Sequence, residues 1–418
     1  MEDFMKKGLW ITLTLVVLAG TMLCMGACSK NKSASDTITV EFFSLNSSYY
    51  DIMEKLIGDF EAQNPGVKIV QNAPPDSWGV LRTRLIGNDA PEIFTSWGGP
   101  DYRMWVESGY IADLTDLPAI KNVADDAREL LRVNGRDYLI AIARNVLGLW
   151  VNVDMFKQLN LNYPTTWAEM IKVCDAFRAA GITPALLCGK DLWTLQEEIQ
   201  VHLLTMPSWR ELDKDVEKHT VDFSDRSKPY YQDVRDMAQR VIIWCSYGQE
   251  DVLGTGPDQL RNDFATGKAA MCVDGSWSIP EFLGSNPNLN FTMIPFPAVN
   301  ARDTLITHAP DDFAVTYSAT AKYPDIAKKF MEFMASKETA LYFAEQSGSL
   351  SAIKGVNYSS PYLLDAYAFI NSGNGIPYPN YEWSPEQMDN IGVAFQGLYA
   401  SGNIEAFCRD LQTGFNTP

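Results

Sequence analysis

The sequence predicts an α/β protein in which strands alternate with helices. Residues 37–45, 67–73 and 91–95 have the apolar, β-branched character of strands. Between them, residues 47–66 and 78–88 carry apolar side chains at helical spacing, and Asn-Pro-Gly ends the first of these helices. Alternating strands and helices are typical of βαβ units, so we expect a mostly parallel sheet.

The rest of the chain continues this pattern over longer elements. Residues 138–156 form a long β-rich segment, and residues 323–348 read as a strongly amphipathic pair of helices. Thr166 and Glu169 have the spacing of a capping box at the start of a helix over 165–181. Residues 269–273 predict another strand, and no short-period repeat or low-complexity segment is visible.

The N-terminus has the features of a secretory signal. Lys6 and Lys7 precede an apolar run over residues 9–23, and the small residues of "MGAC" follow it. Met5 makes a more ordinary start than Met1, because Glu2 and Asp3 are unusual in such a leader. We therefore predict a signal peptide over residues 1–27.

Cys28 resembles the lipidated cysteine of bacterial lipoproteins, although Met25 stands where those proteins usually have leucine. The resemblance implies a lipidated tether over residues 28–36, whose polar composition suits a flexible linker. The protein would then be held at the cell membrane, facing the extracellular or periplasmic side. The alternative is an uncut transmembrane anchor, because a run of about 20 residues could span a bilayer.

Composition limits the classes of partner. The chain has 46% apolar residues and a net charge of −18, so it has ample core and an acidic surface. Such a surface argues against binding to nucleic acid or docking on anionic lipid. After the leader, about 390 residues remain, which exceeds one ordinary domain of roughly 100–200 residues.

Cysteine and histidine spacing predicts neither a metal site nor a cofactor. The five cysteines beyond Cys28 contain no CxxC pair, and the three histidines have no HExxH spacing. We expect mostly buried thiols, with one disulfide possible in an exported protein. The five are Cys174, Cys188, Cys245, Cys272 and Cys408.

Catalytic motifs are also missing, so we predict that the protein is not an enzyme. The sequence contains no GxSxG, P-loop or GxGxxG motif. The pairs Asp311–Asp312 and Glu197–Glu198 could serve a glycosidase as acid and base. Carboxylates adjacent in sequence more often diverge or lie on a solvated surface, and an exported glycan-processing enzyme remains the least favoured alternative.

Tryptophans at loop-like positions are the stronger signal. Trp97, Trp193, Trp277 and Trp383 each stand beside Gly, Pro, Asp or Ser, outside apolar periodic runs. Flat rings suit sugars, because a pyranose presents apolar, slightly positive C–H faces to the negative π face. Neighbouring Asp and Asn side chains can then bond the hydroxyl groups.

Several segments resemble the extracellular solute-binding proteins of ABC importers, in the carbohydrate-binding group that includes maltodextrin binders. "FATGKAAMCVDGSW" is similar to the F-x-x-G-x-x-A-M-x-x-x-G-x-W signature of that group, and "GLWVNVDMF" to G-x-x-Y-N-x-D-x-F with Val151 in place of tyrosine. "PEIFTSWGGPDYRMWVESGYIADL" and "AKYPDIAKKFMEFMASKETALYFAEQSGSLSA" also resemble segments of the group. The resemblance covers nearly the whole chain after the leader.

The resemblance implies a two-lobed, periplasmic-binding-protein-like α/β fold, with discontinuous lobes joined by hinge crossings. The crossings would lie near residues 141–143, 307–309 and 351–355. Lobe one would then comprise residues 37–142 plus 309–354, and lobe two residues 143–308 plus 355–418.

Ligand-binding positions follow from the same resemblance, residue by residue. In the first half of the chain, Asn46 follows the first strand, Trp97 stands after the third strand, and Asn145 lies just past the first crossing. The position of Asn145 often holds a carboxylate in the family, whereas an amide both donates and accepts hydrogen bonds.

The remaining positions come from the second half of the chain. Trp277 matches the signature tryptophan that stacks on sugar, and Asp191 with Trp193 match a polar–aromatic pair. Asp311 stands where many relatives have glycine, and Trp383 lies in a variable segment.

The resulting hypothesis is a lipid-anchored receptor that binds a sugar or oligosaccharide and delivers it to the permease subunits of an ABC transporter. A receptor of the same fold for a non-sugar solute, such as a peptide or a polyamine, is the alternative. A cationic ligand would need converging carboxylates with aromatic rings, which Asp191 and Asp311 could supply. No Lys or Arg occurs among the predicted site residues, which disfavours anionic ligands.

Overall fold

The computed structural model describes residues 37–418. The predicted signal peptide, Cys28 and the tether lie outside the described residues. Within the part of the chain that is described, no helix is both long enough and apolar enough to cross a membrane.

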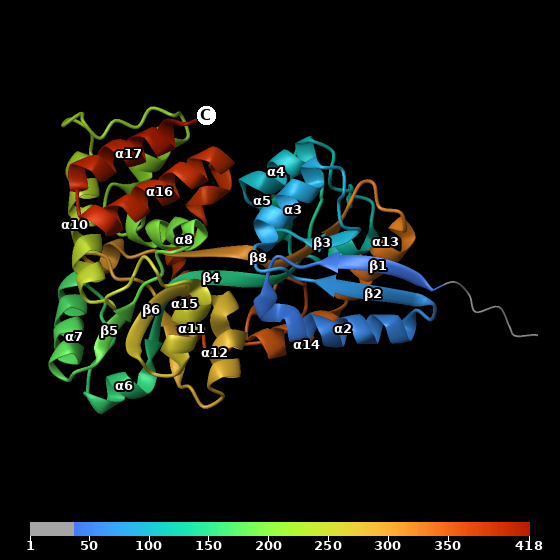
Figure 1. The fold of residues 1–418 in the computed structure, drawn as a ribbon, viewed down its shortest axis with the longest axis horizontal. Helices are drawn as coiled ribbons and strands as arrows, with labels where there is room; N and C mark the ends of the chain where they lie inside the picture. Colours follow the sequence, from blue (N-terminus) through green and yellow to red (C-terminus); the bar gives the residue numbers. More distant parts are fainter. Residues whose placement is uncertain (1–36) are drawn as a thin grey trace, which may run out of the picture.

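Lobe one is built on three short parallel strands at one end of the molecule (Figure 1). Strand β1 (Ile38–Phe43) lies between β2 (Val67–Asn72) and β3 (Ile93–Thr95) and pairs with both in parallel. Buried aromatic side chains of the strands and helices meet in the core of the lobe, where Phe42 of β1 and Phe60 of α2 both pack against Phe330 of α13. The helices of this lobe are α2 (Tyr50–Gln63), α3 (Ser77–Ile86), α4 (Pro100–Glu107), α5 (Asp125–Leu131), α13 (Pro324–Met334) and α14 (Lys337–Ser347).

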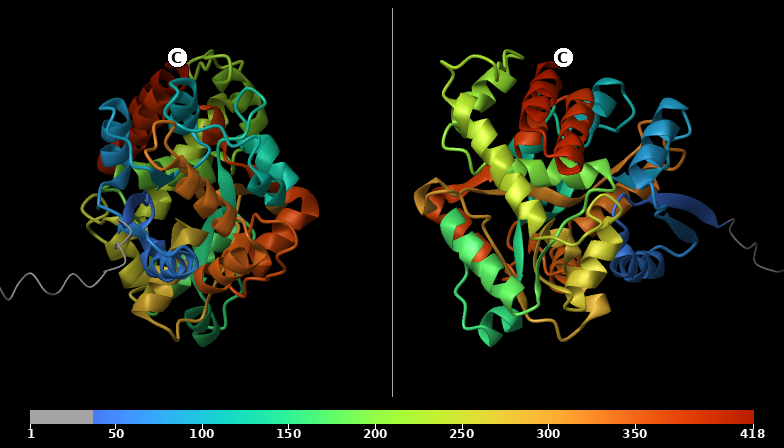
Figure 2. Two further views of the ribbon diagram at one scale, coloured as in Figure 1. Left: turned by 90° about the vertical axis from the view of Figure 1, so that its right-hand side faces the viewer. Right: turned by 60° about the vertical axis from the view of Figure 1, so that its left-hand side comes forward.

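Lobe two occupies the other end and contains β5 (Thr183–Leu186), β6 (Ala269–Gly275) and β7 (Phe291–Ile294). Its C-terminal helices pack beside α10 and α8, as the rotated views in Figure 2 also show for α10. The helices of this lobe are α6 (Val153–Gln158), α7 (Trp167–Ala179), α8 (Leu192–Leu203), α9 (Trp209–Val216), α10 (Tyr230–Ser246), α11 (Pro257–Ala265), α12 (Ile279–Ser285), α15 (Leu364–Phe369), α16 (Pro385–Ser401) and α17 (Ile404–Asn416).

Two long strands connect the lobes. Strands β4 (Ile140–Asn152) and β8 (Ile306–Tyr317) are antiparallel neighbours that run through the middle of the molecule (Figure 1). The register of β4 against β8 shifts twice between Ala141 and Asn145, so residues 310–312 of β8 form an irregular segment. The short strand β9 (Leu350–Ser351) pairs with β4 at the same level. This level is where the chain passes between lobes.

The expectation of a mostly parallel sheet is wrong. Strands β4 and β8 pair antiparallel with each other, and β3–β8, β4–β6, β4–β7 and β4–β9 are antiparallel as well. Parallel pairs occur only within the lobes and at β10 (Gly375–Pro377) beside β8. The reason is that β4 carries the chain from lobe one to lobe two and β8 carries it back.

Local signals in the sequence mark several helix ends. Thr166 and Glu169 form the predicted capping box at the start of α7, in which each side chain bonds the backbone N–H of the other. A second capping box at Ser384 starts α16. Helices α14 and α16 end at Gly348 and Gly402, whose φ angles of 72° and 63° suit glycine at a helix C-terminus.

All five described cysteines are free thiols, four of them buried and Cys245 partly exposed. The expectation of mostly buried thiols is therefore confirmed, and no disulfide forms among the described residues. Within those residues, no group of His, Cys, Asp and Glu side chains has the arrangement of a metal site.

Candidate ligand-binding site

Asn145 and Trp277 are neighbours at the boundary between the lobes. The backbone N–H of Val146 donates to Ser276 Oγ at 3.1 Å, which places the end of β6 against the crossing part of β4. Asn145 is 9% exposed, and its Oδ1 has no hydrogen-bond partner among the described residues. A buried amide oxygen of this kind is available to a ligand hydroxyl group, because buried polar atoms are nearly always hydrogen-bonded.

Trp277 lies directly after β6, on a short 3₁₀ turn over Ser276–Ser278. Its ring folds back over Gly275, where a Cβ atom would lie 2.3 Å from the ring, so only glycine fits there. The side chain is half-buried, and its Nε1 has no acceptor within the described part of the chain. The turn therefore holds an indole at the end of the strand, with its N–H unused.

Lobe one contributes a row of three indoles. Trp97 is 37% exposed and packs on Trp78 with ring centroids 4.9 Å apart. Trp78 packs in turn on the fully buried Trp105, again at 4.9 Å. The contacts hold the exposed ring of Trp97 in place, as a preformed stacking surface for an apolar ring face.

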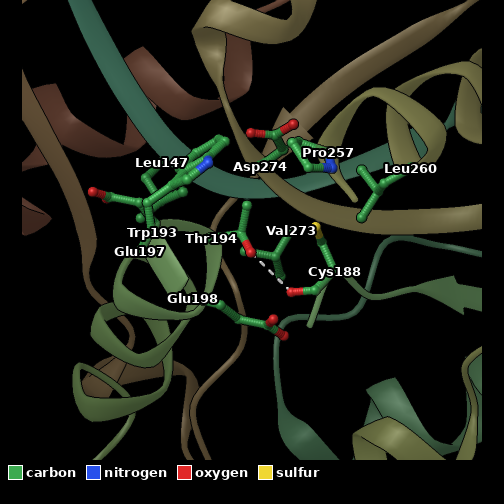
Figure 3. A pocket seen from close by; sticks show the side chains of 10 residues that line it. All are labelled: Leu147, Cys188, Trp193, Thr194, Glu197, Glu198, Pro257, Leu260, Val273 and Asp274. Atoms are coloured by element: carbon green, nitrogen blue, oxygen red, sulfur yellow. Dashed lines mark hydrogen bonds between the residues drawn. The ribbon is translucent and has the colours of Figure 1, made fainter. Parts of the chain in front are cut away.

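Trp193 stands on the first turn of α8, 36% exposed, above a small cavity of ≈ 20 Å³ (Figure 3). This volume suits about one water molecule. Asp191 is the N-cap residue of the same helix, and its side chain makes no capping hydrogen bond. The guanidinium of Arg261 lies 5.8 Å from the Trp193 ring centroid and is bonded to Asp274 at 2.8 Å.

Asn46 follows β1, and its side chain accepts a hydrogen bond from the N–H of Ser48 at 3.0 Å. Ser48 Oγ donates to Glu281 of α12, a contact between the lobes. Glu281 also accepts from Arg261 at 2.9 Å. A chain of polar contacts thus links the loop of Asn46 in lobe one to the Trp193 region of lobe two.

Asp311 is engaged by the protein on both carboxyl oxygens. Oδ2 accepts from the N–H of Gly98, next to Trp97, and Oδ1 accepts from the hydroxyl group of Tyr381. The residue is 2% exposed. Each oxygen of Asp311 therefore has one protein partner, and the prediction that Asp311 contacts ligand stays a prediction. These two hydrogen bonds connect β8, at the crossing, to Gly98 of lobe one and to Tyr381 of lobe two.

The paired carboxylates diverge, as the sequence predicts, but Glu197, Glu198 and Asp311 are buried and Asp312 is partly buried. Asp312 accepts from Tyr49 at 2.5 Å, on the opposite side of β8 from the partners of Asp311. Figure 3 shows that Glu197 and Glu198 of α8 direct their carboxyl groups apart. Glu198 lies 3.4 Å from His202, one turn along the helix.

Glu197 is a site candidate that the sequence singled out only as half of a carboxylate pair for a glycosidase, and not as a ligand contact. It is 7% exposed, and burial together with the charges of Asp274 and Asp311 raises its pKa to about 8. Only Gln200 bonds it, at 3.2 Å. Strongly perturbed carboxyl groups gather at functional sites. No sequence signal predicts the raised pKa of this residue, because the perturbation comes from burial and from acids that are distant in sequence.

Trp383 lies away from these groups. It is 2% exposed, and its ring packs edge-on against Phe415 with centroids 5.5 Å apart, inside the helical core of lobe two. The ring of Trp383 is therefore not exposed toward these groups, and its role as a ligand contact stays a prediction. The neighbouring Tyr378, which sequence analysis passed over, is also buried, with a hydroxyl group unpartnered among the described residues.

The molecule has two lobes, and strands β4, β8 and β9 lie where the chain passes between them. Indole rings and polar atoms without a partner among the described residues lie near this boundary. These features define a two-lobed binding protein. The chain belongs to the bacterial extracellular solute-binding protein family, whose sequence profile matches residues 45–341. The expected family is therefore confirmed. It is a family of receptors, in agreement with the prediction that the protein is not an enzyme.

Two relatives are named for the sugars they bind. The chain is 27% identical to the multiple sugar-binding protein of Streptococcus mutans over 85% of this chain and 84% of the relative. It is 25% identical to the melibiose/raffinose/stachyose-binding protein MelE of Bacillus subtilis, over 94% and 91%.

Solved structures confirm the fold. The solute-binding protein RafE in complex with raffinose superposes with a TM-score of 0.81 at 25% identity, covering 91% of this chain and 99% of that one. The apo form of RafE from Streptococcus pneumoniae superposes with a TM-score of 0.70 at 24% identity, covering 92% and 99%.

Proposed function

We propose that this protein is an extracellular receptor that binds a neutral oligosaccharide between its two lobes and delivers it to an ABC transporter permease. The observation that carries the proposal is the position of Trp277 and Asn145 at the crossing, where Val146 bonds Ser276 and where Asn145 Oδ1 and Trp277 Nε1 have no partner among the described residues. An indole face next to unpaired amide and indole groups matches a sugar ring, which is apolar on its faces and polar at its edge.

The charges at the lobe boundary support a neutral ligand. Asp274 and Asp311 are buried there, and the Arg261 guanidinium already bonds both Asp274 and Glu281. An anionic sugar would meet repulsion from these carboxylates. The relatives named for melibiose, raffinose and stachyose make the raffinose series the first choice of ligand to test.

The same proposal includes the boundaries of the lobes and their motion. We place the lobes at residues 37–142 plus 309–354 and at residues 143–308 plus 355–418, with closure around the ligand by rotation at the crossings. The register shifts of β4 near 141–145 and the pairing of β9 beside them support hinge points at this level. The higher TM-score with the raffinose complex than with the apo form of RafE fits a closed arrangement.

The anchor and the location complete the proposal. Lipidation of Cys28 would hold the receptor at the outer face of the membrane, beside its permease, as the "MGAC" segment suggests. Family membership supports an extracellular or periplasmic location.

Titration calorimetry with raffinose tests the proposal. Trp277→Ala should weaken raffinose binding by about 1–3 kcal/mol, the scale of burying a large apolar side chain. Trp383→Ala is the matched control, because truncating a core tryptophan should lower stability by roughly 3–5 kcal/mol and change affinity little. If raffinose, stachyose and melibiose all fail to bind while spermidine binds, the ligand is a polyamine and the proposal is wrong.

A further inference from the structure

A second cavity lies between lobe two and helix α5 of lobe one. Its volume is ≈ 340 Å³, within the range of small-molecule sites. It opens between α9 and the segment that runs from β10 through the short 3₁₀ helix η6 (Pro379–Glu382). Trp97, Trp193 and Trp277 do not line it.

The walls of the cavity are largely aromatic. Trp209 comes from α9, while Tyr378, Tyr381 and Trp383 come from the opposite segment. All four are less than 10% exposed as residues, so the packing around them fixes the rings. Four aromatic rings around one space bind a flat apolar group well, through area burial and offset stacking.

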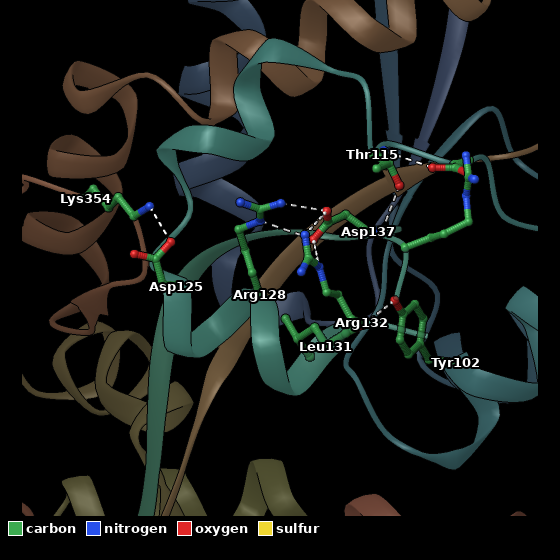
Figure 4. A network of polar contacts seen from close by, with 10 residues as sticks. Tyr102, Thr115, Asp125, Arg128, Leu131, Arg132, Asp137 and Lys354 are labelled. Carbon is green, nitrogen blue, oxygen red and sulfur yellow. Dashed lines mark hydrogen bonds and ion pairs between the residues drawn. The ribbon is translucent and has the colours of Figure 1, made fainter. Parts of the chain in front are cut away.

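Lobe one supplies one wall residue, Leu130 of α5. This helix is firmly held, because Arg128 and Arg132 both bond the buried carboxylate of Asp137 (Figure 4). Tyr102 also donates to the carbonyl of Leu131 at 2.7 Å. The cavity therefore has rigid walls on the side of α5 as well as on the side of lobe two.

The charges on the rim favour a cation. Asp213, Glu217 and Glu382 line the cavity together with Arg210. Glu382 is paired with Arg103 of lobe one at 2.9 Å, and Arg210 is exposed. Burial, together with Glu217, raises the pKa of Asp213 to about 6, against the opposing effect of Arg210. At neutral pH, the half-buried Asp213 carboxylate is ionised, and no described side chain pairs with it.

We propose that this cavity is a second binding site, separate from the sugar site, for an organic cation that carries an ammonium group on a flat apolar body. The ring lies among Trp209 and the aromatic side chains of the opposite wall, and the ammonium group faces Asp213 and Glu217. Aromatic rings together with carboxylates are the usual means of recognising such cations. The proposal does not depend on the identity of the sugar.

Three indole compounds of similar shape test the charge requirement. Tryptamine is a cation, tryptophol is its neutral analogue, and indole-3-acetate is an anion. In titration calorimetry on the full chain at pH 7.5, tryptamine should bind with one-to-one stoichiometry and roughly tenfold more tightly than tryptophol, about 1.4 kcal/mol. Indole-3-acetate should bind more weakly than both. Absence of tryptamine binding, or equal affinity for all three compounds, overturns the proposal.

Variants locate the site. Asp213→Asn should weaken tryptamine binding roughly tenfold and leave tryptophol binding unchanged. Glu211→Gln removes the same charge from the same helix but does not line the cavity, so it should leave tryptamine binding unchanged. Melting curves establish that both variants fold. Trp209→Phe is a second, milder test, because it makes one aromatic side chain of the cavity wall smaller.

Competition separates this site from the sugar site. With raffinose at saturation, tryptamine should still bind at one equivalent. If the number of tryptamine molecules bound per protein falls as raffinose occupancy rises, tryptamine binds in the sugar site and the proposal is overturned. If raffinose does not bind, raffinose is not the ligand of the sugar site, but the tryptamine titrations still decide whether the second site exists.

Discussion

Replacing Glu197 with glutamine should change the pH dependence of stability more than stability itself. Glu197 is buried in α8, and burial with the nearby Asp274 and Asp311 raises its pKa to about 8, from an ordinary value of 4.5. An amide has nearly the same shape and can still accept the hydrogen bond from Gln200. The substitution therefore removes a titrating group and keeps the packing.

The sign follows from linkage. Because the folded-state pKa lies above the unfolded value, the folded protein holds a proton that the unfolded chain releases. The contribution of Glu197 to stability is fully present below pH 4.5 and is lost as pH rises through about 8. Each pKa unit corresponds to 1.36 kcal/mol, so the loss has an upper limit of about 5 kcal/mol, and relaxation around the charge makes the actual loss smaller.

Thermal melting at pH 5, 7 and 9 measures the effect. Glu197→Gln should melt close to the wild type at pH 5 and several degrees above it at pH 9. Glu54→Gln on α2 is the control, since Glu54 is exposed and its loss should not alter the pH profile. A constant offset between wild type and Glu197→Gln at all three pH values would refute the reasoning.

Two further variants test separate parts of the molecule. Cys28→Ala should release the protein into the medium or leave the precursor uncut, seen by fractionation and gel mobility; membrane retention with an intact N-terminus would favour the transmembrane anchor. Gly98→Ala should lower stability by about 1–3 kcal/mol, because the added Cβ would lie 2.1 Å from Leu131 Cδ2. Gly58→Ala on α2 is its control, since no atom lies within 4 Å and the helix should gain up to about 1 kcal/mol.

Sequence patterns predicted the elements of the fold because their signals are local. Helical periodicity located α2 and the α13–α14 pair, and the capping box at Thr166 located the start of α7. Strand direction is different, since it depends on which distant segment pairs with which. The antiparallel pairing of β4 with β8 was therefore missed, and only the resemblance to a family indicated that the two strands connect two lobes.

The sequence could predict those residues of the candidate site that lie at the ends of strands. Trp277 follows β6 and Asn145 lies in the crossing, and the bond between Val146 and Ser276 places them side by side. Burial could not be predicted in the same way. Trp383 stands beside Ser and Glu in sequence, yet Phe415 and the helices of lobe two cover it.

Asp311 shows what the family comparison leaves out. Its two oxygens bond Gly98 of lobe one and Tyr381 of lobe two, so one buried carboxyl group touches both lobes at the crossing. Rotation of the lobes away from each other must break at least one of these bonds. Water would then solvate the freed carboxylate, which recovers much of the lost energy, because a net hydrogen bond to a charged group is worth only about 1.5–3 kcal/mol. If the lobes rotate as proposed, a bond of this strength stabilises the arrangement seen here and is still weak enough to break. The position of Asp311, where many relatives are expected to have glycine, therefore bears on the energetics of lobe closure in this protein more directly than on contact with the sugar.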